Sequence, residues 1–417
     1  MGQYRLSRRL RSNFYGSRRF RAIPIGSKLD KGMRLQVANI EALKVEYWHI
    51  RLTLTITLVK GKLGELALEA KKFFPTEGYP QGTISGLAKA LGMTRSTISA
   101  IINGERDTIA LGRLLKLLDI LKVPYGTLTP YIRSVGGGGA NTKALVNPKF
   151  PIDLYNPYGA RLLAAALKDG HIAKGRHHFL YANYDPENRR IVTEAVQRVF
   201  GEIEPRATYD LKGKQNGIVF TSAVVGKALL RAGAVEGRKT LQVYGLPALV
   251  KFGGHAIANA FFEQAIRDDG CRDLSHYRIK ITCAREIESL ATQEHLGMFE
   301  LLFWETRPLV SGLIQPYLCL TEDLEGKLPD ELKLVYEDFI TKMEKEWVPK
   351  ILKEEQEVIE KTYGVKAKIV PKQMYVGEKT GIKGFWDLVV TGKEYYEKMV
   401  KQLDSVWKKG GDGEHES

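Results

Sequence analysis

The 417-residue sequence predicts an α+β protein in which a small helical module precedes a larger domain of helices and strands. Three observations support this prediction. Residues 79–130 read as short amphipathic helices separated by glycine. Two short apolar helices, 100 positions apart, end in Asp169-Gly170 and Asp269-Gly270, and each leads into a strand-like run. Lys and Arg outnumber Asp and Glu by 63 to 48, and the resulting net charge of +15 favours a polyanionic partner, most often nucleic acid.

The N-terminus reads as a basic flexible arm over residues 1–35, which hold ten Lys and Arg but only one acid. Arginines with aromatic residues between them suit phosphate contacts and base stacking, and an unstructured start without a binding role is the alternative. Residues 36–78 form a small strand-helix segment. Alternation over 46–59 predicts one or two strands, and 60–74 reads as a helix that Pro75 stops.

Residues 79–130 predict a helix-turn-helix. A first helix closes at Gly92, Thr94 caps a second helix over 95–103, and a third spans 110–121. On the second helix Ile98, Ile101 and Ile102 face a core. The stretch "LAKALGMTRSTISAIINGERDTIALGRLLKLLDIL" resembles the Cro/repressor type of helix-turn-helix, which implies that the second helix enters the major groove of DNA. The DNA-binding residues that this implies are Arg95, Ser96, Thr97, Ser99 and Asn103. A helical bundle for protein contacts is the alternative.

Residues 131–150 include Gly136 to Gly139 in sequence and are predicted to be a glycine-rich linker. A domain over 151–410 follows. Its two Asp-Gly helices carry the chemistry. Glycine lets the chain leave a helix through a left-handed turn and leaves the preceding carboxylate at the helix end. If the helices pack side by side, Asp169 and Asp269 lie close together, as a divalent metal centre for phosphodiester cleavage requires. Two ordinary amphipathic helices with glycine caps are the alternative.

The order of elements in this domain resembles the LAGLIDADG homing endonucleases, most closely those of inteins (DOD type). The likeness rests on "ARLLAAALKDGHI", on "LLRAGAVEGRKT" with "GLPALV", and on "AFFEQAIRDDG" followed by "HYRIKI". It implies a pseudo-symmetric αββαββα saddle, with repeat 1 at about 155–250 and repeat 2 at about 251–410. In that family the two helices form the central seam and the sheets lie on double-stranded DNA, so a monomer is expected.

The same resemblance implies residue roles. Asp169 and Asp269 would hold Mg²⁺ and act in catalysis, and Lys239, in "EGRKT", would support the nucleophilic water. A second lysine is expected on the strands at 365–375 and 383–391, with Lys379 and Lys383 as candidates. The basic residues expected on the DNA are Lys174, Arg176, Lys212 and Lys214.

The second motif departs from the family at Gln264 and Arg267, and the first has Leu167 and Lys168 before its Asp. The helical stretch over 328–362 has no counterpart in the resemblance. The expected function is a free-standing, site-specific DNA endonuclease, since no splicing residues stand at the chain ends. The alternatives are a transcriptional regulator on the same fold and an RNA-binding maturase. Three cysteines without a CxxC pair fit a cytoplasmic protein, and no membrane span is expected.

Overall fold

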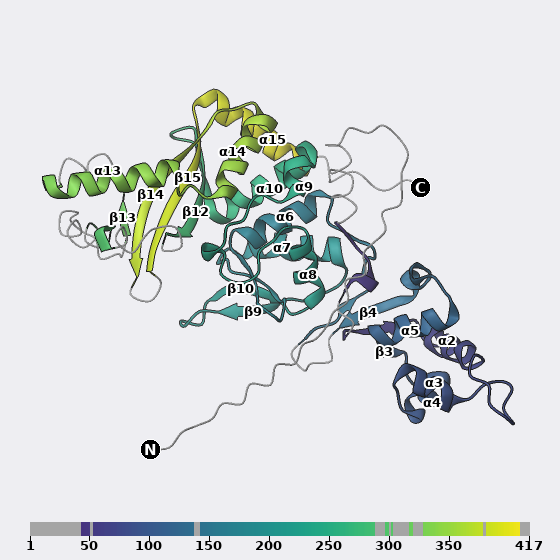
Figure 1. The fold of residues 1–417 in the computed structure, drawn as a ribbon. Coiled ribbons are helices and arrows are strands. Elements are labelled where there is room, and N and C mark those ends of the chain that lie inside the picture. Colours follow the sequence, from purple (N-terminus) through teal and green to yellow (C-terminus); the bar gives the residue numbers. More distant parts are fainter. Residues whose placement is uncertain are drawn as a thin grey trace, which may run out of the picture.

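The computed structural model describes residues 43–50, 53–136, 142–287, 297–299, 302, 317–319, 328–377 and 381–408. The predicted basic arm over 1–35 and the candidate Lys379 lie outside them. Helices and strands are mixed throughout, so the predicted α+β class is confirmed. In Figure 1 the N-terminal module lies at the lower right, next to repeat 1, and repeat 2 lies on the other side of repeat 1.

The described part of the N-terminal module contains four α-helices, at the places that the sequence predicts. Local hydrogen bonds fix where they begin and end. Thr83 accepts a bond from the N–H of Gly86, Thr94 accepts one from Thr97, and Gly92 leaves the first helix of the motif in the left-handed conformation. Apolar side chains at helical spacing bury the inner faces. The helices are α2 (Lys62–Lys71), α3 (Ile84–Leu91), α4 (Arg95–Ile102) and α5 (Leu111–Leu121).

A four-stranded antiparallel sheet supports these helices and corrects two predictions. Its order is β3-β2-β4-β5, and its strands are β2 (Thr55–Leu58), β3 (Thr108–Ala110), β4 (Ile132–Gly136) and β5 (Leu145–Val146). The predicted linker over 131–150 is therefore wrong for β4 and β5, because Val135 and Leu145 are fully buried in the core. The predicted strand over 46–59 begins instead with a short helix, η1 (Tyr47–His49).

Repeat 1 has the predicted order αββαββα. Its antiparallel sheet runs β7-β8-β10-β9, so the two β-hairpins meet at β8 and β10. The strand-like run predicted after Asp169 is two strands joined by a turn. The elements are α6 (Pro157–Leu167), β7 (Gly170–Ile172), β8 (Phe179–Tyr181), α7 (Pro186–Phe200), β9 (Arg206–Tyr209), β10 (Gln215–Phe220) and α8 (Ala223–Arg231).

Repeat 2 follows the same plan but contains additional elements between β12 and β14. The sheet order β11-β12-β15-β14 matches β7-β8-β10-β9, and β13 adds an edge. The stretch over 328–362 is two helices, separated where Pro349 precedes the second. The elements are α10 (Gly254–Asp269), β11 (Gly270–Asp273), β12 (Arg278–Glu286), β13 (Tyr317–Cys319), α13 (Asp330–Lys345), α14 (Lys350–Tyr363), β14 (Ala367–Gly377), β15 (Gly381–Thr391) and α15 (Lys393–Lys408).

The two Asp-Gly helices, α6 and α10, pack along each other at the centre of the saddle-like domain (Figure 1). Every residue of α6 from Gly159 to Leu167 is buried, and so is every residue of α10 from Ile257 to Ile266. Alanines at Ala160, Ala164 and Ala260 are fully buried, and such short side chains allow two helices to approach closely. This seam brings together the two helix ends that carry the predicted site.

Shorter elements join these parts. The connector between the repeats holds η3 (Lys239–Leu241) and α9 (Ala248–Phe252), and η2 (Tyr125–Tyr131) leads into β4. A two-stranded pair joins β1 (Lys44–Val45) to β6 (Ile152–Asp153). No helix in the described part of the chain is long and apolar enough to cross a membrane.

Candidate functional site

The helix-turn-helix residues mostly lie where the sequence predicts them. Ile98 and Ile101 are buried, whereas Ile102 is half-buried at the edge of the core. Arg95, Ser96 and Asn103 are exposed, and with the half-buried Ser99 they follow the i, i+1, i+4, i+8 spacing of one helix face. Thr97 is an exception, because its hydroxyl lies 2.7 Å from the hydroxyl of the capping residue Thr94.

A chain of contacts places the ends of α6 and α10 next to each other. Gly170, which follows Asp169, pairs with Tyr181 on β8. The hydroxyl of Tyr181 donates to a carboxylate oxygen of Asp268 at 2.5 Å, and Asp268 directly precedes Asp269. The two Asp-Gly turns are therefore joined through one tyrosine of repeat 1, as the adjacency of the predicted carboxylates requires.

The carboxylates at this seam are in an unfavourable place for negative charge. Burial and the neighbouring charge of Asp269 raise the pKa of Asp169 to about 7, against a hydrogen bond from the side-chain amide of Asn183 at 2.8 Å. Burial also raises the pKa of Asp269, although the charges of Lys168, Lys239 and Lys372 oppose it. Two buried carboxylates that repel each other favour the binding of a cation between them.

Lys239 lies beside both carboxylates, as the resemblance implies, but it also closes the end of α6. Its ammonium donates to the carbonyl oxygens of Ala166 at 3.3 Å and Leu167 at 3.0 Å, and to that of Lys168. These carbonyls have no partner within the helix, so the lysine satisfies them. Burial lowers the pKa of Lys239 to about 8, and the negative charge of Asp269 works against that shift.

Two further residues at the seam were not predicted. Lys168 is 3% exposed and its ammonium lies 2.9 Å from a carboxylate oxygen of the fully buried Glu355 on α14. Burial alone would lower the pKa of Lys168, but Glu355 raises it above the ordinary value. The sequence shows Lys168 only as a departure from the family pattern, and the stretch that supplies Glu355 could not be aligned.

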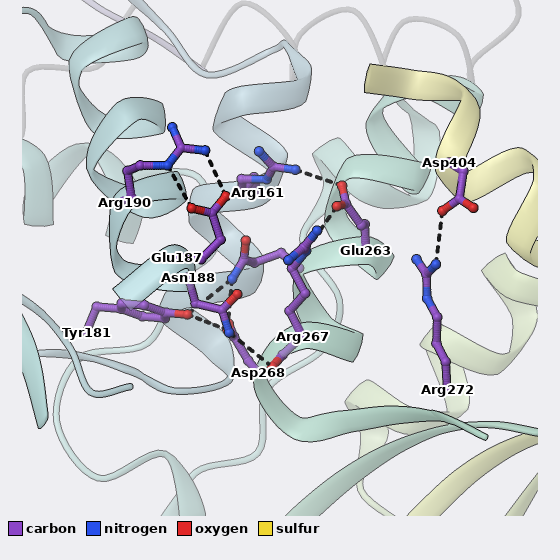
Figure 2. A network of polar contacts seen from close by, with 11 residues as sticks. Arg161, Tyr181, Glu187, Asn188, Arg190, Glu263, Arg267, Asp268, Arg272 and Asp404 are labelled. Carbon is purple, nitrogen blue, oxygen red and sulfur yellow. Dashed lines mark hydrogen bonds and ion pairs between the residues drawn. The ribbon is translucent and has the colours of Figure 1, made fainter. Parts of the chain in front are cut away.

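A polar network crosses the seam itself, where Arg161 of α6 points to Glu263 of α10 (Figure 2). Their ion pair of 2.7 Å is buried, and the same carboxylate accepts a bond of 3.0 Å from Arg267. The predicted departures at Gln264 and Arg267 therefore have structural partners, since Gln264 donates to Asp268 at 2.8 Å. The Arg161–Glu263 pair joins α6 to α10, whereas the bonds of Gln264 and Arg267 lie within α10.

The four basic residues predicted on the first sheet are all exposed, but they occupy two places. Lys174 and Arg176 lie in the β7–β8 turn. Lys212 and Lys214 lie in the β9–β10 turn, where Lys214 contacts the ring of Tyr184. Strand β7 begins directly after Asp169, and β10 runs in the same direction as β7 because both are antiparallel to β8. The β9–β10 turn, which precedes β10, therefore lies at the same end of the sheet as Asp169.

The second sheet carries a basic hollow that the sequence did not reveal. It has a volume of about 320 Å³ and lies across β12, β14 and β15. The buried carboxylate of Asp387 accepts a bond of 2.7 Å from Thr282 and lies 3.5 Å from the ammonium of Lys372. Four basic side chains line it: Arg278, Lys280, Lys368 and Lys372.

Lys372 is also the lysine on these strands whose charge acts on Asp269. Of the two predicted candidates, Lys379 lies outside the described residues. Lys383 lies over the ring of Tyr375, 5.7 Å from its centre, and is not among the charges that shift either aspartate. Lys372 is therefore a further candidate for the second lysine of the site. No sequence signal separates it from the other lysines of the strand pair.

The donor set at the seam suits a hard divalent cation. The groups present are carboxylates and backbone carbonyls, and one oxygen of Asp268 is buried without a hydrogen-bond partner in the described structure. No group of three His, Cys, Asp or Glu side chains among the described residues could enclose a metal. Mg²⁺ commonly binds through one or two carboxylates and keeps several waters, so Asp169 and Asp269 together fit it.

Comparison with known proteins identifies the N-terminal module. Residues 82–128 match the family described as Helix-turn-helix, which agrees with the sequence prediction of this motif and fits a DNA-binding role. No curated protein matches the chain.

Two solved structures share a weak similarity with the chain. Full-length DUF199/WhiA from Thermatoga maritima is 9% identical with a TM-score of 0.29, and the alignment covers 63% of each chain. The N-terminal LAGLIDADG domain of DUF199/WhiA is 10% identical with a TM-score of 0.29, covering 64% of this chain and 86% of that one. Similarity at this level assigns neither a fold nor a function.

Proposed function

We propose that this protein binds a specific sequence in double-stranded DNA and hydrolyses a phosphodiester bond there with Mg²⁺. The observation that carries the proposal is the meeting of two equivalent helix ends, which bring Asp169 and Asp269 together with Lys239 beside both. The helix-turn-helix supplies sequence recognition, and the basic turns and the hollow on the second sheet supply contacts to phosphates.

The residues of the seam have distinct roles in this proposal. Asp169 and Asp269 would hold the metal, which when bound lowers the pKa of a water and stabilises charge on the phosphate. Lys239 and Lys372 provide positive charge near the phosphate oxygens, where a developing negative charge is favoured by a nearby cation. Asn183 orients Asp169 through its hydrogen bond. Lys168 and Glu355 hold the end of α6 from within the protein and do not face the DNA.

The test is strand scission on a plasmid library with Mg²⁺, followed by sequencing of the ends produced. The wild type is expected to cut at one site. Asp169→Asn and Asp269→Asn are expected to lose cleavage but to keep DNA affinity, since neither removes a positive charge. Asp404→Asn is the matched control, because this carboxylate is half exposed and pairs only at the surface with Arg272. Absence of Mg²⁺-dependent scission by the wild type on any sequence contradicts the proposal.

A transcriptional regulator on the same fold is the second candidate. The observation that favours it is the ammonium of Lys239, which is already bonded to three carbonyl oxygens of α6 and so has a structural role. A regulator predicts tight, specific binding with no cleavage, so the same library assay separates the two functions.

DNA reading is tested separately from cleavage. Arg95→Ala and Asn103→Ala are each expected to weaken specific binding by about 1–3 kcal/mol if the side chain contacts a base. Lys116→Ala is the control, because this lysine is exposed on α5 rather than α4. Log affinity should fall linearly with log salt, with a slope of about −0.9 per phosphate contact. If both α4 variants keep the site preference of the wild type, α4 does not read the DNA sequence.

A further inference from the structure

The short strand β5 belongs to both parts of the molecule. On one side it pairs with β4, and the N–H of Asn147 donates to Arg133 at 2.8 Å. On the other side Val146 exchanges two backbone bonds with Glu202 of repeat 1, at 2.9 and 2.8 Å. A backbone ladder with partners on both sides is fixed in position, unlike the flexible linker that the glycines of this stretch predict.

Further bonds along the same stretch hold it to repeat 1. The N–H of Lys143 donates to the hydroxyl of Thr221 at 2.9 Å, and the N–H of Lys149 donates to Phe200 at 3.0 Å. The chain passes close to Gly201, whose φ of +115° and whose lack of a Cβ allow this approach, because a Cβ there would lie 2.5 Å from the carbonyl oxygen of Asn147. Only glycine meets both conditions.

A second connection lies elsewhere in the fold. Strand β1 pairs with β6, at the entrance to α6. Directly after β1, the ring of Tyr47 packs 6.0 Å from that of Phe150, and its hydroxyl donates to the carbonyl of Tyr125 at 2.6 Å. Tyr47 is fully buried. Two separate connections prevent the helix-turn-helix module from turning about a single joint.

We propose that the helix-turn-helix module and repeat 1 form one rigid DNA reader that recognises a single composite site with a fixed spacing. The inference rests on the proposed binding of DNA by the sheets. In Figure 1, α3 and α4 lie beyond repeat 1 on the side away from repeat 2, so the three units follow one another. A rigid connection offers its two reading surfaces at one separation, whereas a flexible tether accepts many.

The experiment starts from the site that the full-length wild type selects from random duplexes. Spacers of 5 and 10 base pairs, about half and about one helical turn, are then inserted between the two protected blocks. We expect both spacers to lower the affinity at least tenfold, towards that of the block read by α4 alone. Retention of affinity with the 10-base-pair spacer, which restores the facing of the two blocks, would overturn rigidity.

Val146→Pro tests the structural cause. Proline removes the N–H that donates to Glu202, and the side chain of Val146 is 41% exposed, so little packing is lost. We expect this variant to bind the unmodified site more weakly and to tolerate both spacers within about threefold. Val146→Ala keeps the N–H and is expected to behave as the wild type. A spacing preference unchanged in Val146→Pro would contradict the role of β5.

The outcomes separate this inference from the proposal on which it rests. If the sheet of repeat 1 does not bind DNA, selection returns only the block read by α4, and Lys212→Ala with Lys214→Ala, in the exposed β9–β10 turn, changes neither affinity nor salt dependence. If the sheets bind but the connection is flexible, both blocks are selected at variable separations. Only two blocks at one separation support the inference, and either other result rejects it.

Discussion

The ends of α6 and α10 occupy equivalent positions in the two repeats but carry different residues. Gly170 pairs with Tyr181 on the neighbouring strand, and Gly270 pairs with Ile281 in the same register. Asp169 and Asp269 are therefore true equivalents, and both are retained. The residue before each aspartate differs, because it is a lysine in repeat 1 and a second aspartate in repeat 2.

Both preceding residues nevertheless do the same work. Lys168 reaches Glu355 on α14 of repeat 2, and Asp268 reaches Tyr181 on β8 of repeat 1. Each side chain thus crosses to the opposite repeat and ties one helix end to it. The position before the aspartate therefore accepts either charge if the other repeat supplies a partner, whereas the proposed site requires an aspartate directly before the glycine in both repeats.

The largest loss of stability is expected from removal of the Lys168–Glu355 ion pair. Lys168→Met leaves the carboxylate of Glu355 buried without its cation, and such a loss costs about 3–5 kcal/mol of stability. The free energy of unfolding in urea measures it. Asp268→Asn is the matched change in repeat 2 and is expected to cost about 1 kcal/mol or less, because the amide oxygen still accepts the bond from Tyr181.

The double variant Lys168→Met with Glu355→Gln isolates the cause of that loss. Removing both charges together should restore most of the stability, since the unpaired carboxylate rather than the lost contact is the main cost. If the double variant is as unstable as Lys168→Met, the pair is not what braces α6, and the comparison between the two repeats fails at this position.

A smaller change in stability, of opposite sign, is expected from substitution of Asp169. The folded pKa of Asp169, about 7, lies above its ordinary value of 3.8, so the folded state binds the proton more tightly and stability falls as the pH rises through this window. Asp169→Asn should therefore raise stability at pH 8 in the presence of a chelator, by at least about 1 kcal/mol, the equivalent of one pKa unit. The gain should vanish near pH 4, where wild-type Asp169 is protonated.

Thermal unfolding at both pH values, with and without Mg²⁺, measures this prediction. Because a metal held by both carboxylates removes their repulsion, Mg²⁺ should stabilise the wild type at pH 8 and have little effect on Asp169→Asn. Equal stability of the two proteins at pH 8 in chelator would show that the carboxylates do not repel each other, and the seam would then offer no site for a cation.

The sequence predicted the parts of this seam that depend on local pattern. The Asp-Gly pair after an apolar helix is recognisable in the sequence, and in the helix-turn-helix so are the cap at Thr94 and the glycine that ends the first helix. The partners across the seam could not be predicted, because Lys168 and Glu355 are 187 positions apart and nothing in either local pattern requires the other. Their pairing depends on the packing of α14 beside α10, which neither local pattern predicts.

The stretch after η2 shows a different limit of sequence reasoning. Four consecutive glycines predict a linker, but the apolar residues on either side decide the structure. Val135 and Leu145 are fully buried and pair with each other across β4 and β5. The glycine-rich composition predicted a linker because a strand as short as β5, with two residues, leaves almost no periodic signal in the sequence.

The smallest effect is expected at Asn183 and Cys283. Each lies two residues after the strand partner of the glycine, which is Tyr181 in repeat 1 and Ile281 in repeat 2. Asn183 occupies this position in repeat 1 and donates to Asp169 at 2.8 Å, which lowers the pKa of that carboxyl. Cys283 occupies it in repeat 2, where burial raises the pKa of the thiol to about 12, so it stays neutral. Asn183→Ala should therefore raise the pKa of Asp169 further above 7, by about one to two units, since a hydrogen bond to a charged group contributes about 1.5–3 kcal/mol. Cys283→Ala should leave the pKa of Asp169 unchanged. Carbon-13 NMR titration of the aspartate carboxyls in chelator measures the pKa of Asp169 in both variants. Equal changes of this pKa in the two variants would contradict the specific role of Asn183.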